Sequence, residues 1–348
     1  MKIFNIQTRI RPHLKMLTPY SSARSEYSGA AKLFLDANEN PFDNGQNRYP
    51  DPLQSKLKTI LSSIRNCTSD RIFIGNGSDE AIDLLIRMFC EPAKDHVLTT
   101  SPTYGMYKVS ATINNVSVVD VPLEDGFSLP VEKILERTNE KTGIIFICSP
   151  NNPTGNAFPT DQILEVVDRS GTLVVVDEAY IDFSERESLI HLSNRPNLVV
   201  LQTLSKAFGL AGLRLGMAFA DPEIIGLLNQ IKPPYNISNV AQEHAVAFLN
   251  EFDLQKMISE IKVERESLRF KLEHLKTVRK IYPSEANFLL TQFEDPQAVY
   301  QYLKNRGIIV RDRSREPGCS GCLRITVGTS TENMLLLKTL QEFESTLK

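Results

Sequence analysis

A lysine in a loop behind a buried strand is the residue of this sequence with the clearest capacity for covalent chemistry. Lys206 stands in Ser205-Lys206-Ala207-Phe208-Gly209, directly after the apolar run at residues 198–202. In open α/β sheets such a position lies at the carboxyl end of a strand, where ligands bind. One interpretation is an amine that forms a Schiff base with an aldehyde cofactor. A solvated loop lysine is the alternative.

An acid ends a second apolar run. Asp177 follows Val174-Val175-Val176, and a carboxylate in such a place is costly to bury unless it meets a cation. A protonated pyridine ring is such a cation. At ~4 Å and an effective dielectric near 20, the pairing is worth roughly 4 kcal/mol, or about three pKa units. Such a ring can accept the electrons of a broken Cα–H bond. A helix-capping aspartate is the alternative.

A rigid turn with paired asparagines follows the apolar run that ends at Cys148. The turn reads Ser149-Pro150-Asn151-Asn152-Pro153-Thr154-Gly155, and its prolines and glycine can fix the direction of the Asn152 amide. Together with Tyr180, Asn152 could donate a hydrogen bond to a phenolic oxygen on an aromatic cofactor. A turn alone would explain the prolines and the glycine, but not the pair of asparagines.

A glycine-rich turn precedes a helix and supplies a preformed anion site. Gly75-Asn76-Gly77 leads into Ser78-Asp79-Glu80, so backbone N–H groups and a helix N-terminus face the same place. The stretch lacks the Gly-Lys-Ser/Thr of a P-loop and the spacing of a dinucleotide fingerprint, which favours a single phosphate. Ser205 and Arg214 could complete the phosphate shell, Arg214 as a bidentate donor. Tyr104 could stack on a flat ring or fill the core.

Alternating apolar runs and helical patterns between about residues 70 and 230 predict the elements that position these side chains. This alternation is typical of β-α units and a mostly parallel sheet with helices on its faces. We expect strands at 71–74, 97–100, 116–121, 144–148, 173–176, 198–202 and 215–220.

The pattern changes after about residue 255 and predicts a smaller α+β domain. We expect a charged helix over 254–276, strands at 288–291, 308–311 and 323–327, and a final amphipathic helix. The domain prediction is therefore a large cofactor-binding α/β domain over 31–254, and a small domain formed by 1–30 and 255–348. The first 30 residues should pack on the small domain or on a second subunit.

Composition argues against several classes of partner. The chain has 348 residues with 39 Lys plus Arg against 42 Asp plus Glu, which leaves no global field to attract nucleic acid. No apolar stretch approaches the ~20 residues that cross a bilayer, so we expect no membrane association and a cytoplasmic location. Five cysteines argue against a disulfide framework. Cys319 and Cys322 lack a second pair at zinc-site spacing, so we expect no metal.

The asparagine turn, the strand-end acid with its tyrosine, and the Ser-Lys stretch followed by Arg214 together resemble the fold-type I pyridoxal-phosphate aminotransferases. Within that fold type the chain is similar, from Leu17 to Thr329, to the histidinol-phosphate aminotransferase family. The segments that carry the narrower resemblance are 17–24, 35–41, 48–51, and 307–311 with 323–328.

The resemblance implies a role for each candidate residue. Lys206 would bind the aldehyde of pyridoxal 5'-phosphate and move a proton between the substrate Cα and the cofactor C4′, while Asp177 would pair with the ring nitrogen. Asn152 and Tyr180 would bind the phenolic oxygen, and Tyr104 would cover the ring. The cofactor phosphate would be held by Ser78 and Asp79 main-chain amides, by Ser205 and Arg214, and by Tyr49 of a second subunit. The substrate's anionic group would be surrounded by Tyr20, Arg311 and Arg324.

The implied reaction joins two small substrates on a homodimer with shared sites. L-histidinol phosphate and 2-oxoglutarate would give 3-(imidazol-4-yl)-2-oxopropyl phosphate and L-glutamate in two half-reactions. One pocket must then accept a phosphate ester and a carboxylate, and a guanidinium fork such as that of Arg324 pairs with either. Threonine-phosphate decarboxylase and an aromatic aminotransferase are the alternatives on the same fold. A cofactor-sensing regulator is a further alternative, but neither terminus has the charge of a DNA-binding segment.

Overall fold

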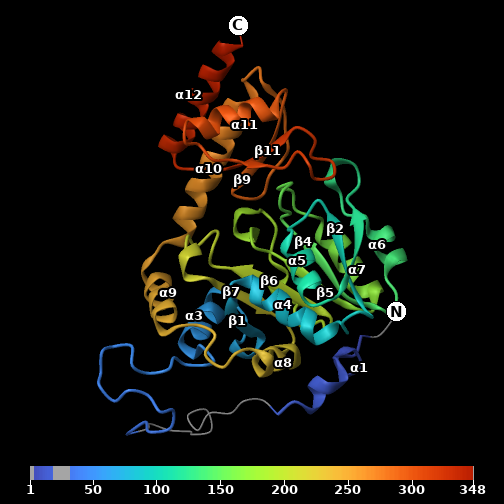
Figure 1. Ribbon diagram of the computed structural model, residues 1–348, viewed down its shortest axis with the longest axis vertical. Coiled ribbons are helices and arrows are strands. Elements are labelled where there is room, and N and C mark those ends of the chain that lie inside the picture. The colour runs from blue at the N-terminus through green and yellow to red at the C-terminus, as the bar shows by residue number, and fades with distance from the viewer. Residues whose placement is uncertain (1–3, 19–31, 348) are drawn as a thin grey trace.

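Two β-sheets from successive parts of the chain organise the structure, a computed structural model that describes residues 4–18 and 32–347 (Figure 1). The large sheet has the strand order β1-β7-β6-β5-β4-β2-β3, and the small one β10-β11-β9-β8. The large-sheet strands are β1 (Ile72–Asn76), β2 (His96–Ser101), β3 (Ser117–Pro122), β4 (Thr142–Cys148), β5 (Leu173–Asp177), β6 (Leu198–Thr203) and β7 (Leu215–Phe219). The small-sheet strands are β8 (Val278–Ile281), β9 (Phe288–Phe293), β10 (Arg311–Asp312) and β11 (Cys322–Thr326).

Strand direction in the large sheet gathers several loops at one edge. β3, β2, β4, β5 and β6 run parallel to one another, whereas β7 runs antiparallel to both β6 and β1. The carboxyl ends of β2, β4, β5 and β6 therefore share an edge with the beginning of β7. The expected mostly parallel sheet is confirmed.

Helices cover both faces of the large sheet, because its strands are apolar on both sides. In β5, Leu173 and Val175 join one core cluster, while Val174 and Val176 join the other, as the alternation of side chains along a strand requires. One face packs against α4 (Ser78–Phe89), α5 (Met106–Ile113) and α8 (Pro222–Ile231). The opposite face packs against α3 (Ser55–Arg65), α6 (Val131–Arg137), α7 (Thr160–Ser170) and α9 (Asn239–Glu251).

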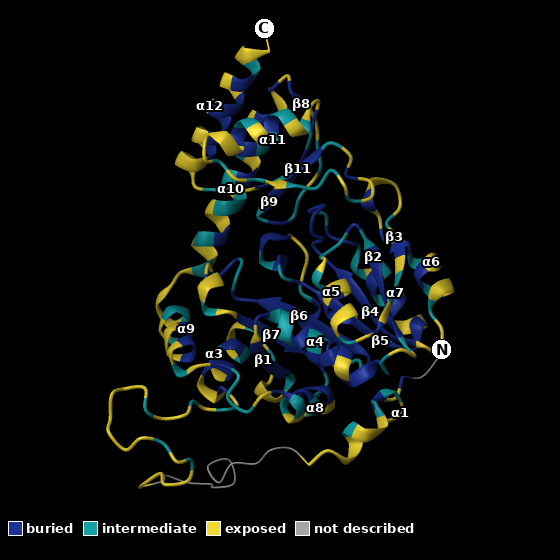
Figure 2. Ribbon diagram, in the orientation of Figure 1, coloured by how far each residue is buried: buried dark blue, intermediate teal, exposed yellow. Residues whose placement is uncertain are grey.

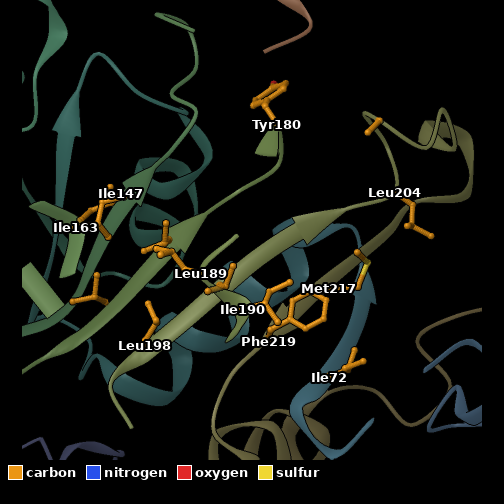
Figure 3. Packing of buried hydrophobic residues seen from close by; sticks show 14 of the residues in the cluster. Ile72, Ile147, Ile163, Tyr180, Leu189, Ile190, Leu198, Leu204, Met217 and Phe219 are labelled. Carbon is orange, nitrogen blue, oxygen red and sulfur yellow. The ribbon is translucent and has the colours of Figure 1, made fainter. Parts of the chain in front are cut away.

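The burial pattern follows these layers. Figure 2 shows the large-sheet strands buried except for the edge strand β3, and the segment at 32–50 mostly exposed. Figure 3 shows part of one core cluster, in which Ile147, Leu198 and Met217 come from β4, β6 and β7. Tyr180 belongs to the same cluster but follows the end of β5, so the cluster reaches the edge of the sheet where the loops gather.

A long helix connects the large sheet to the small one. Helix α10 (Leu254–Glu273) has 20 residues, about 30 Å of helix, and leads from α9 to the small sheet (Figure 1). Its Leu268 and Leu272 pack with α11 (Pro296–Asn305), α12 (Ser330–Thr346) and one face of β9 and β11. The small unit thus has its own core, and its sheet faces the loops of the large sheet.

The structure differs from the sequence-based expectation at the N-terminal arm. In the described part, residues 4–18, Phe4 and Ile6 join the core cluster beneath α4, and the Arg11 N–H donates to the Met88 carbonyl at 3.0 Å. Helix α1 (Ile6–Arg9) thus lies against the large domain rather than the small one, because its apolar side chains extend that core. The division of the chain into domains stays a prediction.

The small sheet also differs in extent from the expected one. We expected a strand at 308–311, but only Arg311–Asp312 forms a ladder with β11. Ile308 and Val310 instead pack against the core of the small unit. A further strand, β8, was not expected from the sequence, since its sequence Val-Arg-Lys-Ile carries only two apolar residues.

Candidate active site

A pocket of about 270 Å³ lies where the loops at the carboxyl edge of the large sheet face β11 and the loop after β10. It brings together most of the candidate residues from the sequence. Its candidate residues are Ser78, Asp79, Tyr104, Asn152, Asp177, Tyr180, Ser205, Lys206, Arg214 and Arg324. Segments far apart in the chain therefore meet in one cavity, as strand direction requires.

Asp177 lies at the bottom of this pocket and is held on both oxygens. The Tyr107 hydroxyl donates to Oδ2 at 2.7 Å, and the Ala179 N–H donates to Oδ1 at 3.0 Å. Burial raises the pKa of the Asp177 carboxyl, and these hydrogen bonds offset only part of that rise. Within residues 4–18 and 32–347, no Lys or Arg lies within ion-pair distance of it. The site therefore favours a cationic ligand group beside Asp177.

Tyr107 is a site residue that the sequence reasoning missed. It is fully buried, and its ring stacks on Phe146 with the ring centroids 4.7 Å apart. This packing fixes the hydroxyl under Asp177. Its signal in the sequence was only an aromatic residue near the start of a helix, three positions after Tyr104, which is also typical of a core residue.

Lys206 occupies a closed loop after β6. The Leu204 N–H donates to the Leu215 carbonyl at 3.0 Å, and the Leu210 N–H donates back to the Leu204 carbonyl at 2.9 Å. Burial lowers the pKa of the Lys206 amine, and the charge of Arg324 lowers it further, against the opposing effect of Asp177. A lowered pKa increases the neutral, nucleophilic fraction of the amine.

Asn152, Tyr180 and Arg324 form a chain of hydrogen bonds across the pocket. The Arg324 Nη1 donates to the Asn152 Oδ1, and the Asn152 Nδ2 donates to the Tyr180 hydroxyl at 3.4 Å. Burial raises the pKa of the Tyr180 hydroxyl, which keeps it neutral and able to donate. The guanidinium of Arg324 also lies 5.2 Å from the centre of the Phe288 ring.

The N-terminus of α4 forms the opposite end of the pocket. Its N-cap is Gly77, which makes no side-chain capping bond, so the first amides of the helix remain available to an anion. At Gly216 a Cβ would lie 2.0 Å from the Ser78 nitrogen. Only a glycine at this position therefore lets β7 lie so close to the turn before α4. Arg214 precedes β7, and its carbonyl accepts from the Gly77 N–H at 2.6 Å.

Asp79 and Tyr104 complete this end of the pocket. The Tyr104 hydroxyl donates to the Asp79 Oδ1 at 3.1 Å, and the Arg214 Nη2 lies 3.7 Å from the Asp79 Oδ2. Burial raises the pKa of the Tyr104 hydroxyl, with the nearby charge of Asp79 as the second cause. The Asp79 carboxylate thus holds both Tyr104 and Arg214 beside the helix N-terminus.

The donor set of this pocket fits pyridoxal 5'-phosphate. Gly77 has φ +77°, and a Cβ there would lie 2.7 Å from the Arg214 Nη2, so a side chain would occupy the space next to the free amides. The Ser78 and Asp79 amides, Ser205 and Arg214 would hold a phosphate. Lys206 would meet an aldehyde and Asp177 a pyridinium nitrogen, with chemistry that suits each group.

Two candidate residues, Tyr49 and Arg311, do not line this pocket, and a third, Tyr20, lies outside the described residues. Tyr49 is half-exposed, stacks on Tyr235 with the ring centroids 4.5 Å apart, and lines a neighbouring cavity of about 700 Å³. Arg311 pairs across the ladder with Arg324, and both line a third cavity of about 330 Å³. Arg324 is therefore shared between two cavities.

Arg313 lines the pocket although the sequence reasoning did not select it. Its signal was a second arginine two positions after Arg311.

Among the described residues, no cluster of three or more His, Cys, Asp and Glu side chains could hold a metal ion. Nor does any helix in the part of the chain that the structure describes combine the length and apolarity that crossing a membrane requires.

Comparison with known proteins relates this geometry to one family. The sequence model of aminotransferase class I and II matches residues 32–339. Histidinol-phosphate aminotransferase of Flavobacterium johnsoniae is 49% identical over 346 residues, 98% of this chain and 99% of the relative. The same enzyme of Parabacteroides distasonis is 50% identical over 342 residues, again 98% and 99%.

A solved structure extends the comparison to the fold. The histidinol-phosphate aminotransferase of Sinorhizobium meliloti, solved in complex with pyridoxal-5'-phosphate, matches with a TM-score of 0.79 at 24% identity. The match covers 86% of this chain and 84% of that one. At this identity the likeness concerns the fold, which is the arrangement of two sheets described above.

Proposed function

This chain belongs to the aminotransferase class I and II family, and from that membership we propose that it transfers the amino group of L-histidinol phosphate to 2-oxoglutarate. The products are 3-(imidazol-4-yl)-2-oxopropyl phosphate and L-glutamate, a step of L-histidine biosynthesis. The observation that carries the proposal is the single pocket in which Lys206, Asp177 and Arg324 meet. An amine, an acid and a guanidinium there provide for cofactor attachment, ring protonation and substrate binding.

Pyridoxal 5'-phosphate, when bound, supplies an aldehyde for amine exchange and a ring that accepts the electron pair released at the substrate Cα. The protein must hold that ring and move one proton. Asp177 would hold the ring nitrogen in its protonated form, because an ion pair in this buried site would offset the desolvation that raises the Asp177 pKa. Tyr107 and the Ala179 amide fix the direction of the carboxylate.

Lys206 moves the proton. When the cofactor is bound, the Lys206 Nζ would serve as the base for the proton of the substrate Cα. The lowered pKa of Lys206 suits this task, because only the neutral amine can accept a proton. Tyr180 and Asn152 would hold the phenolic oxygen of the ring, and Tyr104 would cover one of its faces.

Arg324 binds the anionic end of either substrate. Its fork can pair with two oxygens of a phosphate or of a carboxylate, which a lysine offers only as a point charge. The Asn152 amide holds the guanidinium in position from the large-domain side. Its cross-strand neighbour Arg311 and Tyr20 belong to the same proposed anion site.

The proposal includes a homodimer with shared sites and a cytoplasmic location. The segment at 32–50 extends away from the large domain in Figure 1. Tyr49 lines a cavity that is also lined by Arg214. In a symmetric dimer, a partner's Tyr49 could reach the cofactor phosphate that Arg214 holds. The five cysteines are free, which is consistent with a reducing compartment.

The two half-reactions test the proposed function separately. The purified enzyme should absorb visible light through the cofactor on Lys206, L-histidinol phosphate should remove that band, and 2-oxoglutarate should restore it. Sodium borohydride should fix the cofactor to the peptide that contains Lys206. Release of carbon dioxide from threonine phosphate, without bleaching by L-histidinol phosphate, would identify the decarboxylase instead.

A further inference from the structure

Arg313 stands in a firmly held position at the substrate end of the pocket. Its N–H donates to the Cys322 carbonyl at 2.9 Å, one residue beyond the β10–β11 ladder. Its side chain forms an ion pair with Glu316, through Nη1 and Oε1. The Glu316 N–H in turn donates to the Arg313 carbonyl at 3.0 Å, so backbone and side chain close the same short turn.

One donor of the Arg313 guanidinium has no partner. The side chain is only 20% exposed, and its Nε is buried without a hydrogen-bond acceptor among the described residues. A buried N–H that belongs to a charged group costs free energy when it is unpaired. The ion pair with Glu316 therefore positions the guanidinium but does not satisfy it. A ligand bound in the pocket that Arg313 lines would supply further acceptors to the guanidinium.

Positive charge is concentrated at this end of the pocket. The charge of Arg313 affects both Arg324, whose pKa it lowers after the larger effect of burial, and Tyr180, whose pKa it also lowers against burial. Arg311 acts on Arg324 in the same direction, whereas Glu316 opposes both. The guanidinium groups of Arg313 and Arg324 thus both line this end of the pocket, an arrangement that an anionic ligand of high charge would stabilise.

Resting on the proposed function, we propose that Arg313 is a specificity-determining residue that binds the phosphate of the amino donor together with Arg324. The number of oxygen atoms distinguishes the two anions. A carboxylate has two oxygens, and the fork of Arg324 can pair with both. A phosphate ester has three terminal oxygens and about twice the charge, so it needs a further donor, which the guanidinium of Arg313 in the same pocket provides.

The inference separates the two half-reactions. Arg324 serves phosphate and carboxylate alike, whereas Arg313 discriminates in favour of the phosphate-bearing donor. L-histidinol, which has the same amine and imidazole but no phosphate, should gain nothing from Arg313. L-glutamate should gain little, because its carboxylates leave no third oxygen for the extra donor.

The test is Arg313→Gln, with Arg315→Gln as a matched control in the same loop. Arg315 is exposed, so the control removes one positive charge without touching the pocket. For L-histidinol phosphate, kcat/KM in Arg313→Gln should fall about 10- to 100-fold, the range for a hydrogen bond to a charged group. For L-histidinol and L-glutamate it should change less than about 3-fold. Arg315→Gln should match wild type for all three donors.

A second readout does not depend on turnover. Inorganic phosphate, titrated into the holoenzyme by calorimetry, should bind Arg313→Gln about 10-fold or more weakly than wild type or Arg315→Gln. An equal loss with all three donors would show that Arg313 supports the loop, and would overturn the inference. Unchanged phosphate affinity would also overturn it. A wild-type enzyme that does not react with L-histidinol phosphate refutes the proposed function, while the phosphate titration still decides the role of Arg313.

Discussion

Replacing Asp177 by asparagine separates the electrostatic role of this residue from a structural one. The change keeps the shape of the side chain and an oxygen that can accept the Tyr107 hydroxyl, which now donates at 2.7 Å. It removes the negative charge. Asp177 is 3% exposed, so an effective dielectric near 20 is appropriate, and an opposite charge at ~4 Å contributes roughly 4 kcal/mol. We therefore expect both half-reactions to slow by about 10³-fold.

The stability of the cofactor-free protein should change in the opposite direction. Burial raises the pKa of Asp177 above its usual 3.8. A carboxyl group whose pKa is raised in the folded state adds stability only as the pH falls through its folded-state pKa towards its unfolded-state pKa. At neutral pH its charged form destabilises the fold. At pH 7 the apo form of Asp177→Asn should thus melt at or above the wild-type temperature. Cofactor binding should raise the melting temperature of wild type more than that of the variant.

Asp182→Asn is the matched control. Asp182 lies five residues further along and pairs with Arg65 through two bonds of 2.7 and 2.9 Å, outside the pocket. This variant should lose stability but retain the rate of both half-reactions. Single-turnover absorbance and thermal melts of apo and holo protein measure all four quantities. A rate for Asp177→Asn within tenfold of wild type, or an apo protein that melts well below wild type, would refute the reasoning.

Three further predictions concern neighbouring groups. The rate at which the apoprotein takes up the cofactor should rise with pH through a midpoint below 10.5, because the neutral Lys206 amine reacts and its pKa is lowered. Arg324→Gln should move that midpoint upward. A wild-type midpoint at 10.5 or above would contradict the lowered pKa of Lys206. Tyr107→Phe should raise the Asp177 pKa further and weaken cofactor binding about 10-fold, measured by fluorescence titration, with unchanged binding as the contrary result. Mixed and refolded Tyr49→Phe and Lys206→Ala proteins should exceed the mean activity of the two variants, because hybrid dimers regain one intact site; no gain argues against shared sites.

The positions of Asp177 and Lys206 at one edge of the sheet could be predicted, because the sequence shows where the buried strands end. Asp177 and Lys206 each follow an apolar run, and parallel strands place such residues at one edge. The large sheet is buried on both faces, so its strands appear as continuous apolar runs. The sequence did not predict that β7 runs antiparallel to β6, although this direction places Arg214 at the same edge.

Tyr107 and Arg313 were not predicted as site residues, because their roles depend on packing that the sequence pattern does not show. Tyr107 acts from beneath Asp177, and nothing in an amphipathic helix tells a core aromatic from one whose hydroxyl supports a carboxylate. Arg313 lies beyond a two-residue strand, where the twist of the loop decides which cavity a side chain faces. The sequence analysis selected Arg311 and not Arg313, whereas the structure places Arg313 at the pocket and Arg311 at the third cavity.

The contact between the two sheets explains why the substrate end depends on the small unit. Arg324 belongs to β11, yet it donates to Asn152 in the turn after β4. The same amide donates to Tyr180, which stands beside the ring site. A substrate anion that pairs with Arg324 and Arg313 therefore neutralises charge at the point where the small unit contacts the cofactor-binding turn. Because Arg324 also lowers the pKa of Lys206, a bound anion should offset that effect and favour the protonated form of the Lys206 amine.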